Sequence, residues 1–282
     1  MFDGIFHKLQ EKKPYVHCIT NYVTANDCAN IVLAWGARPV MADSVCEAEE
    51  ITAGCDALVI NMGTLSESKI SAMLIAGRKA NELNHSVILD PVGVGASSFR
   101  QRAAFQLLDE IRFSVIRGNG SEIRTLYYGF GKTKGVDVGE KDKITEDTIN
   151  EACKTAALLA KRTKAVIVLT GSTDIVTDGK TMYLIRNGHS SMSKISGTGC
   201  MLSAIIGVLC AALNEEPLKA AAAGTVLMGL CGEIAYGKIT ERKEGTASLK
   251  IHLIDAIGMI DEEMLKERAF IEKVRKEYGE DE

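Results

Sequence analysis

The eight cysteines of this chain lack the spacing of a metal site or a disulfide framework. No two of them form a C-x-x-C pair, most lie in apolar stretches, and the five histidines do not cluster. These absences argue against a zinc site and against a disulfide-rich secreted protein. We therefore expect reduced, buried thiols. The cysteines stand at positions 18, 28, 46, 55, 153, 200, 210 and 231.

Basic stripes and membrane-spanning runs are also missing. The 33 Lys and Arg residues are outnumbered by 37 Asp and Glu, which gives a net charge of −4 and a pI of about 5.8. This balance disfavours nucleic acid and anionic membranes as partners. Residues 1–14 carry charges and no apolar core of a signal peptide, and the apolar runs at 201–213 and 218–235 are too short or contain charges. We expect a soluble cytoplasmic protein.

Two common phosphate-binding motifs are absent. Gly131-Lys132-Thr133 resembles the end of a Walker A loop, but Leu126 stands where its first glycine should fall. No G-x-G-x-x-G follows the first predicted strand, which disfavours a dinucleotide-binding Rossmann site.

The chain does contain short β-type runs that alternate with helical patterns. Its 282 residues, 46% of them hydrophobic, suffice for one large α/β domain or two small ones. Apolar strands between helices indicate a mostly parallel sheet covered on both faces. We find no linker or repeat and predict a single domain, 1–282. Strands are predicted over 16–19, 39–41, 57–62, 87–90, 115–117 and 165–169, and helices over 25–35, 45–53 (capped by Ser44), 66–83 (capped by Ser66) and 145–162 (capped by Thr145).

The last third of the chain gives a different pattern. Residues 181–185 and 191–195, joined through Asn187-Gly188, predict a β-hairpin. The rest of this third is predicted to be helical. The highly charged tail from about residue 262 to 282 predicts a solvated helix.

Polar and glycine-rich residues follow the predicted strands. In parallel α/β sheets, ligands bind at the carboxyl ends of the strands, so these residues should gather at one site. They are Thr20-Asn21, Met41, Asn61-Met62-Gly63, Asp90-Pro91-Val92-Gly93, Arg117-Gly118-Asn119 and Thr170-Gly171.

Ser196-Gly197-Thr198-Gly199-Cys200 is the most informative stretch. It follows a strand-like run ending at Ile195 and precedes a buried helical run, 201–213. Glycines at such a junction let backbone N–H groups converge on a phosphate, and the helix dipole assists. The same dipole should lower the pKa of the Cys200 thiol. The alternative is a glycine turn before a core helix that carries a buried cysteine.

Two carboxylates near these strand ends have two interpretations each. Asp90 could hold Mg²⁺ through water or merely cap a turn. Glu122, in the first turn of a helix after Asn119, could bind a Mg²⁺-bound water or complement the helix dipole. Arg117 suits a phosphate or a carboxylate, and Thr170-Gly171 could contact a nucleotide.

Together these motifs resemble those of hydroxyethylthiazole kinases. They occur in the family's order over residues 14–235, and cysteine in the glycine-rich loop is specific, because related ribokinase-like enzymes usually have aspartate there. The motifs are Thr20-Asn21, Pro39-Val40-Met41, Asn61-Met62-Gly63-Thr64, Leu89-Asp90-Pro91-Val92-Gly93, Ile116-Arg117-Gly118-Asn119, Leu169-Thr170-Gly171 and Ser196-Gly197-Thr198-Gly199-Cys200.

The resemblance implies a ribokinase-like fold and ATP-dependent phosphorylation of 4-methyl-5-(2-hydroxyethyl)thiazole, a step of thiamine salvage. It further implies a homotrimer with active sites between subunits. The implied roles are thiazole contacts for Met41 and Gly197, approach of Asn21 to the thiazole, ATP contacts for Arg117 and Thr170, and Mg²⁺ positioning for Asp90 and Glu122. Backbone N–H groups around Gly197, Gly199 and Cys200 would stabilise the transferring charge.

Some alternatives stay open at the level of sequence. Cys200 could accept the hydroxyl proton late or only orient the alcohol. The acceptor could be another small heteroaromatic alcohol, such as a hydroxymethylpyrimidine, and a catalytically silent ligand sensor is a further possibility. The family's Gly-Pro-Gly-Ser-Phe-like segment is replaced here by Gly245-Thr246-Ala247-Ser248-Leu249.

Overall fold

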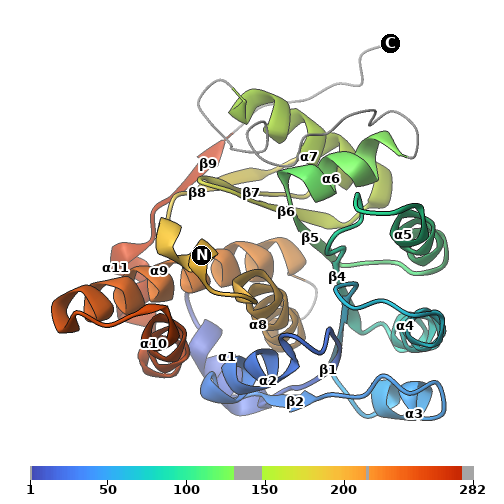
Figure 1. The fold of residues 1–282 in the computed structure, drawn as a ribbon, viewed down its shortest axis with the longest axis horizontal. Helices are drawn as coiled ribbons and strands as arrows, with labels where there is room; N and C mark the ends of the chain where they lie inside the picture. Colours follow the sequence, from blue (N-terminus) through green and yellow to red (C-terminus); the bar gives the residue numbers. More distant parts are fainter. Residues whose placement is uncertain (1, 130–147, 214–215, 275–282) are drawn as a thin grey trace.

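A computed structural model describes residues 2–129, 148–213 and 216–274 of the chain (Figure 1). The strands of these residues form one sheet in the order β2-β1-β3-β4-β5-β6-β7-β8-β9. Neighbours from β2 to β6 are parallel, and β7, β8 and β9 each run antiparallel to the strand before them. The predicted mostly parallel α/β sheet is thus confirmed. The strands are β1 (Tyr15–Ile19), β2 (Arg38–Val40), β3 (Ala57–Asn61), β4 (Ser86–Asp90), β5 (Val115–Asn119), β6 (Val166–Thr170), β7 (Asp174–Thr177), β8 (Met182–Ile185) and β9 (Ile271–Val274).

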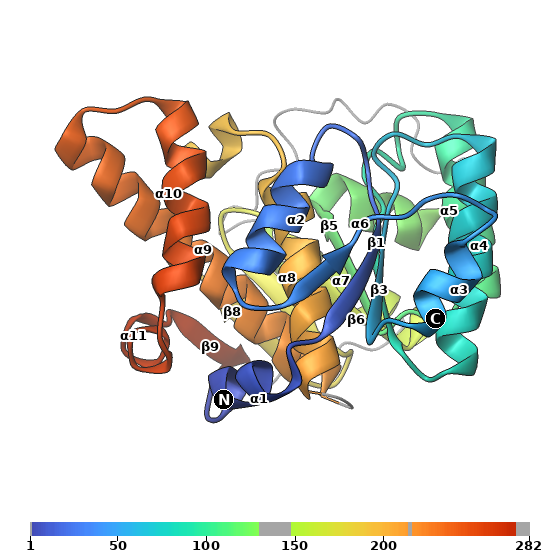
Figure 2. The same cartoon turned by 90° about the horizontal axis from the view of Figure 1, so that it is seen from below.

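Helices cover both faces of this sheet (Figures 1 and 2). Side chains alternate along each strand, and every strand except the edge strand β2 contributes side chains to two separate hydrophobic cores. One core contains residues of α4, α5, α6 and α7, and the other contains α1, α2, α8, α9 and α10. The helices are α1 (Ile5–Lys12), α2 (Ala25–Ala34), α3 (Ala48–Ala53), α4 (Glu67–Glu82), α5 (Ser98–Glu110), α6 (Gly120–Tyr128), α7 (Ile149–Thr163), α8 (Thr198–Leu213), α9 (Pro217–Arg242), α10 (Thr246–Met259) and α11 (Glu262–Arg268).

Helix α8 and the part of α9 from Ala220 to Gly232 are apolar all round because they lie inside the second core. Helix α8 packs on β1, β3 and β4, and Gly207 allows this approach, since a Cβ there would lie 2.6 Å from Val59 Cγ2. Helix α9 is long and apolar enough to cross a bilayer by length and composition, but 78% of its apolar window is buried within the protein. Both helices therefore suit a protein core.

The predicted hairpin over 181–185 and 191–195 is wrong. Residues Ser190–Lys194 form a 3-10 helix (η1), whose first turn is capped by the His189 side chain, which accepts a hydrogen bond from Ser191 N at 3.1 Å. Strand β8 pairs instead with β7, which the sequence pattern missed. The turn between them is made by Asp178, whose side chain accepts hydrogen bonds from Lys180 N and Thr181 N, and by Gly179 at φ +85°.

Other predicted boundaries also shift. Helix α3 begins at Ala48, three residues after the predicted start, because the Ser44 hydroxyl accepts from Cys46 N in a local turn. The predicted helical tail ends as a helix at Arg268, and its continuation pairs with β8 as strand β9. The predicted cap Thr145 and the Gly131-Lys132-Thr133 segment lie outside the described residues. Helix α5, capped by Ser97, was not predicted.

Candidate active site

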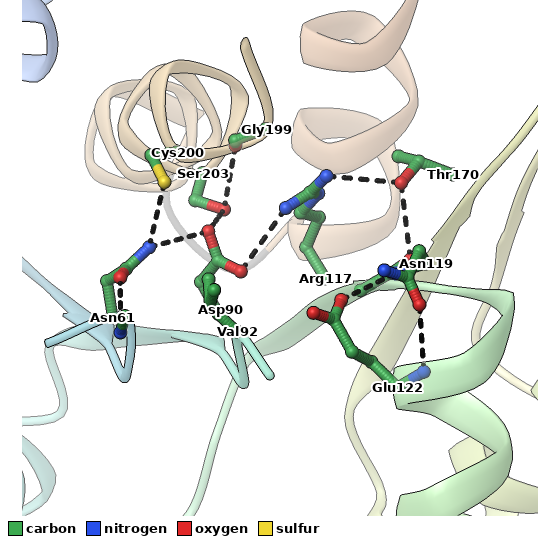
Figure 3. A network of polar contacts seen from close by, with 12 residues as sticks. Asn61, Asp90, Val92, Arg117, Asn119, Glu122, Thr170, Gly199, Cys200 and Ser203 are labelled. Atoms are coloured by element: carbon green, nitrogen blue, oxygen red, sulfur yellow. Dashed lines mark hydrogen bonds and ion pairs between the residues drawn. The ribbon is translucent and has the colours of Figure 1, made fainter. Parts of the chain in front are cut away.

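The site lies at the carboxyl ends of β1, β3, β4, β5 and β6, which face the first turn of α8 (Figure 3). The order of the sheet places β1 and β3 side by side although β2 lies between them in sequence. Such a reversal of strand order opens a crevice at the strand ends, where ligands of α/β proteins bind. The predicted gathering of polar residues at this edge is therefore observed.

Gly197 sets the start of α8. Its φ of +93° is a left-handed conformation, and a Cβ there would lie 2.7 Å from Thr24 Cγ2, so only glycine fits. The first helical hydrogen bond runs from Met201 N to Gly197 O at 2.8 Å. The N–H groups of Thr198, Gly199 and Cys200, which come before Met201 in the first turn, therefore have no partner within the helix. They are available to bind an anion.

The Cys200 thiol lies between the side-chain amides of Asn21 and Asn61. Asn21 Nδ2 and Asn61 Nδ2 both donate to its Sγ, at 3.4 and 3.3 Å. Asn21 Nδ2 also donates to Asn61 Oδ1 at 3.0 Å. Burial, with the nearby Asp90 charge, raises the pKa of the Cys200 thiol. The expectation of a lowered pKa is wrong, because desolvation outweighs the hydrogen bonds and the helix terminus.

Asp90 ends β4 and is fully buried. Its Oδ2 accepts hydrogen bonds from Asn61 Nδ2 at 2.8 Å and Ser203 Oγ at 2.9 Å. Its Oδ1 forms an ion pair with Arg117 Nη1 at 3.2 Å. Burial raises the pKa of this carboxyl even though all three partners oppose the shift. An additional cation nearby would stabilise the ionised form of a carboxyl that is buried in this way.

The Arg117 guanidinium contacts Asp90 at one end and Thr170 at the other. Its Nη2 donates to Thr170 Oγ1 at 3.1 Å, and its buried Nε has no hydrogen-bond partner. A Cβ at Gly199 would overlap the guanidinium. The absence of a side chain at Gly199 is therefore what lets an arginine lie against the first turn of α8.

Glu122 lies in the first turn of α6 and forms a capping box with Asn119. Its Oε2 accepts from Asn119 N at 2.8 Å, and its Oε1 accepts from Gly93 N, in the loop after β4, at 2.9 Å. Burial raises the pKa of Glu122, and the charge of Asp90 raises it further. The carboxylate therefore caps the helix and also lies within the electrostatic reach of Asp90.

A cavity of about 630 Å³ opens beside Arg117 and the start of α8. Its walls include Thr170, Gly171 and Gly199 on one side and the 3-10 helix and α9 on the other. Asp174 also lines it, accepts a hydrogen bond from Gly171 N at 2.8 Å, and has its pKa raised to about 7 by burial. The cavity therefore lies beside the N-terminus of α8 and has room for a nucleotide.

The structure brings most of the predicted site residues together. Hydrogen bonds or direct packing join Asn21, Asp90, Arg117, Thr170, Gly199 and Cys200, and Glu122 is linked through Gly93. Met41 stands outside this network, past the end of the edge strand β2, with 38% of its surface exposed.

Three residues with direct contacts here were not assigned roles from the sequence. Asn61 stood in a noted strand-end motif, but nothing in the sequence indicated that it joins Asp90 to Cys200. Ser203 and Arg100 lie inside helices and show no strand-end signal. Ser203 contacts Asp90, and Arg100 donates to the backbone of the loops after β3 and β4.

The donor set suits a hydrated divalent cation rather than a closed metal centre. No three His, Cys, Asp or Glu side chains in the part of the chain described here converge on one point. Asp90 and Glu122 supply two buried carboxylates, and burial raises the pKa of both. Mg²⁺ keeps much of its water shell and is held by one or two carboxylates together with substrate phosphates, so these residues fit it.

Comparison with known proteins agrees with this geometry. The sequence model of the hydroxyethylthiazole kinase family matches residues 6–263. Hydroxyethylthiazole kinases of Clostridium acetobutylicum and Ruminiclostridium cellulolyticum are 50% and 44% identical, over 91% and 96% of this chain and 93% and 96% of their own. The structure of the Pyrococcus horikoshii hydroxyethylthiazole kinase protein superposes with a TM-score of 0.85 at 34% identity, over 97% of this chain and 99% of that one.

More distant structures share the fold alone. A ribokinase-like superfamily protein of Enterococcus faecalis superposes with a TM-score of 0.60 at 12% identity, covering 88% of each chain. The sheet thus has a ribokinase-like fold, and the family match defines the protein as a kinase. Within this class, the family is shown by the sequence model that matches residues 6–263 and by a relative that is 50% identical. The chain belongs to the hydroxyethylthiazole kinase family.

Proposed function

We propose that this single-domain kinase transfers the γ-phosphoryl group of ATP to the primary alcohol of 4-methyl-5-(2-hydroxyethyl)thiazole, in thiamine salvage. The observation that carries the proposal is the hydrogen-bonded chain from Asn21 through Asn61 to Asp90, with Cys200 beside it at the anion-binding end of α8. The alcohol oxygen bonds to the γ-phosphorus as the bond to the β–γ bridging oxygen breaks, and the hydroxyl proton is released.

ATP is proposed to occupy the cavity beside Arg117. Its phosphates would extend to the start of α8, where the N–H groups around Gly197, Gly199 and Cys200 stabilise negative charge. Arg117 and Thr170 contact the nucleotide from the ends of β5 and β6. The support is their hydrogen bond at the cavity wall and the unpartnered Arg117 Nε.

Asp90 and Glu122 would hold Mg²⁺ through its water shell. When bound, this ion would supply positive charge that offsets the negative charge developing during transfer. The contribution of the chain is to keep both carboxylates buried and oriented, Asp90 by its three side-chain partners and Glu122 by two backbone N–H groups.

The acceptor is proposed to bind on the β1 and β2 side of the site. Met41, Gly197 and Asn21 would contact the thiazole, and Cys200 would direct the alcohol toward the γ-phosphate. With its pKa raised, the thiol stays protonated near neutral pH and is a poor base. We therefore favour an orienting role, since phosphoryl transfer depends mainly on positioning and electrostatics.

A cytoplasmic homotrimer with active sites between subunits is also part of the proposal. Apolar side chains are exposed around the acceptor side, including Tyr22 (81% exposed), Val23 (60%) and Val45 (38%). An exposed apolar group of this kind suits contact with a second subunit.

The direct test is incubation of the protein with Mg·ATP and the thiazole alcohol, followed by mass spectrometry. We expect the phosphate ester and ADP in equal amounts. A thermal shift with the thiazole alcohol but no ester would instead indicate a ligand sensor. Such a result would contradict the proposal.

A further inference from the structure

Arg100 lies in the first turn of α5 and makes contacts that its helix does not require. A cation near a helix N-terminus is electrostatically unfavourable, and α5 has no acidic residue in that turn to compensate it. The guanidinium reaches instead to three backbone carbonyls, those of Met62, Gly63 and Val92. These belong to the loops after β3 and β4, which flank the site.

Two of these carbonyls belong to peptide units whose N–H groups, on the opposite side, donate to active-site side chains. Arg100 Nη1 donates to Met62 O, and the N–H of the same peptide unit, Gly63 N, donates to Asn61 Oδ1 at 2.9 Å. This bond fixes which end of the Asn61 amide is the acceptor. The Nδ2 end then points to Asp90 and Cys200.

The second peptide unit lies between Val92 and Gly93. Arg100 Nη1 donates to Val92 O at 2.8 Å, and the N–H on the opposite side, Gly93 N, donates to Glu122 Oε1 at 2.9 Å. If this peptide rotated, its carbonyl would turn toward the Glu122 carboxylate, and two negative oxygens would meet. One guanidinium therefore fixes the direction of both peptide units.

We propose that Arg100 is a positioning residue for the phosphoryl transfer, acting through these two peptide units on Asn61 and Glu122. This inference rests on the proposed function of the site. Arg100 reaches neither the cavity nor Cys200 itself. Its effect is to keep the Asn61 amide directed at Asp90 and Cys200 and the Glu122 carboxylate in place for the cation.

The test compares Arg100→Met, Arg100→Lys and the control Arg102→Met, an exposed arginine on the same helix. We expect Arg100→Met to lower kcat by about 10- to 100-fold, since small misplacements of reacting groups have effects of this size. The KM for the thiazole alcohol should stay within about threefold, because none of its proposed contacts bonds to Arg100. Arg100→Lys should recover only part of kcat. The lysine keeps the positive charge, but its ammonium lacks the planar fork that reaches both peptides.

A second readout needs no acceptor. Calorimetric titration of ATP at increasing Mg²⁺ should show that Arg100→Met needs several-fold more Mg²⁺ for the same ATP affinity, while Arg102→Met matches the unmodified protein. If Arg100→Met only lowers Tm, with kcat and Mg²⁺ dependence equal to those of Arg102→Met, the residue is structural and the proposal is wrong. If the unmodified protein makes no ester, the proposed function fails, and the titration still decides whether Arg100 positions the cation site.

Discussion

At the scale of single residues, Cys200 differs most from what its position in the sequence indicates. A helix N-terminus normally favours a thiolate, yet burial and the nearby Asp90 charge raise the pKa of this thiol. Whether a residue at a helix start is also desolvated depends on the loops folded over it. In this protein those loops follow β1 and β3, far from Cys200 in sequence.

We expect Cys200→Ala to lower kcat only about tenfold, below the 10²- to 10⁴-fold expected for loss of a general base. Cys200→Asp should remain active, since a carboxylate can also accept the two asparagine N–H groups. Steady-state turnover at saturating Mg·ATP measures both variants. A loss above 10³-fold for alanine, together with a wild-type kcat that rises with pH as the thiol titrates, would establish a base instead.

Asp174 makes stability depend on pH. Its pKa is about 7 in the folded protein, raised by burial from 3.8. A raised pKa gives stability that is fully present below pH 3.8 and is lost as pH rises through 7, because the unfolded chain ionises first. Asp174→Asn, which can still accept from Gly171 N, should therefore raise Tm more at pH 8 than at pH 5.5.

The control for Asp174 is Asp109→Asn, which changes an exposed carboxyl on α5. Thermal unfolding of both variants at the two pH values provides the comparison. An equal Tm difference at pH 5.5 and pH 8 for Asp174→Asn would show that this carboxyl does not titrate in the interval.

Sequence reasoning identified the site residues that stand at strand ends. Asp90, Arg117 and Thr170 were identified because parallel strands bring their carboxyl ends together. Ser203 and Arg100 were not, because each reaches the site from within a helix, and only tertiary packing shows which helix face points there. Met41 also stood at a predicted strand end, and its thiazole-contact role came from resemblance alone; it lies outside the hydrogen-bonded network.

At the scale of elements, the buried parallel strands were the most predictable part of the chain. Runs such as 57–62 and 87–90 are apolar because both faces of the sheet are covered, and the structure confirms them as β3 and β4. The antiparallel edge was less predictable. Strand β9 follows a charged helix, and half of its residues face solvent, so its pattern resembles a surface segment.

The start of α8 offers an element-scale prediction. Gly197→Ala should destabilise the protein by about 1–2 kcal/mol, because alanine resists positive φ, and its methyl would press on Thr24. It should also lower kcat by displacing the anion-binding turn. Gly237→Ala in α9 is the matched control, since a Cβ there meets nothing within 4 Å. It should stabilise by about 0.5–1 kcal/mol.

Chemical denaturation and steady-state kinetics measure both glycine variants. A Gly197→Ala protein that matches Gly237→Ala in stability and turnover would show that the start of α8 tolerates a side chain, and the assignment of the phosphate site to this turn would fail.

At the scale of the whole molecule, the mostly parallel sheet and the helices on both faces follow from the alternation of strands and helices along the sequence. Two features could not be predicted this way. The position of α8 across β1, β3 and β4 depends on close packing at Gly207, and the proposed contact between subunits rests on apolar side chains whose exposure only the fold reveals.

The proposed trimer predicts complementation between subunits. Met41 lies outside the network that joins Asn21 to Cys200 within one chain, so Met41→Ala and Gly197→Ala variants should each lose activity alone, yet after subunit exchange some sites would combine an intact Met41 with an intact Gly197 from different chains. Activity of the mixture above the sum of its parts supports shared sites. Full activity of a monomer isolated by ultracentrifugation would contradict them.

The central claim is that this site phosphorylates the thiazole alcohol, and a competition assay tests it most directly. Equal concentrations of 4-methyl-5-(2-hydroxyethyl)thiazole and hydroxymethylpyrimidine are incubated with the protein and limiting Mg·ATP, and both phosphate esters are quantified by mass spectrometry. Our account predicts that the thiazole ester forms in large excess and that its yield follows the ATP consumed. Excess pyrimidine ester, or consumption of ATP without either ester, would contradict it.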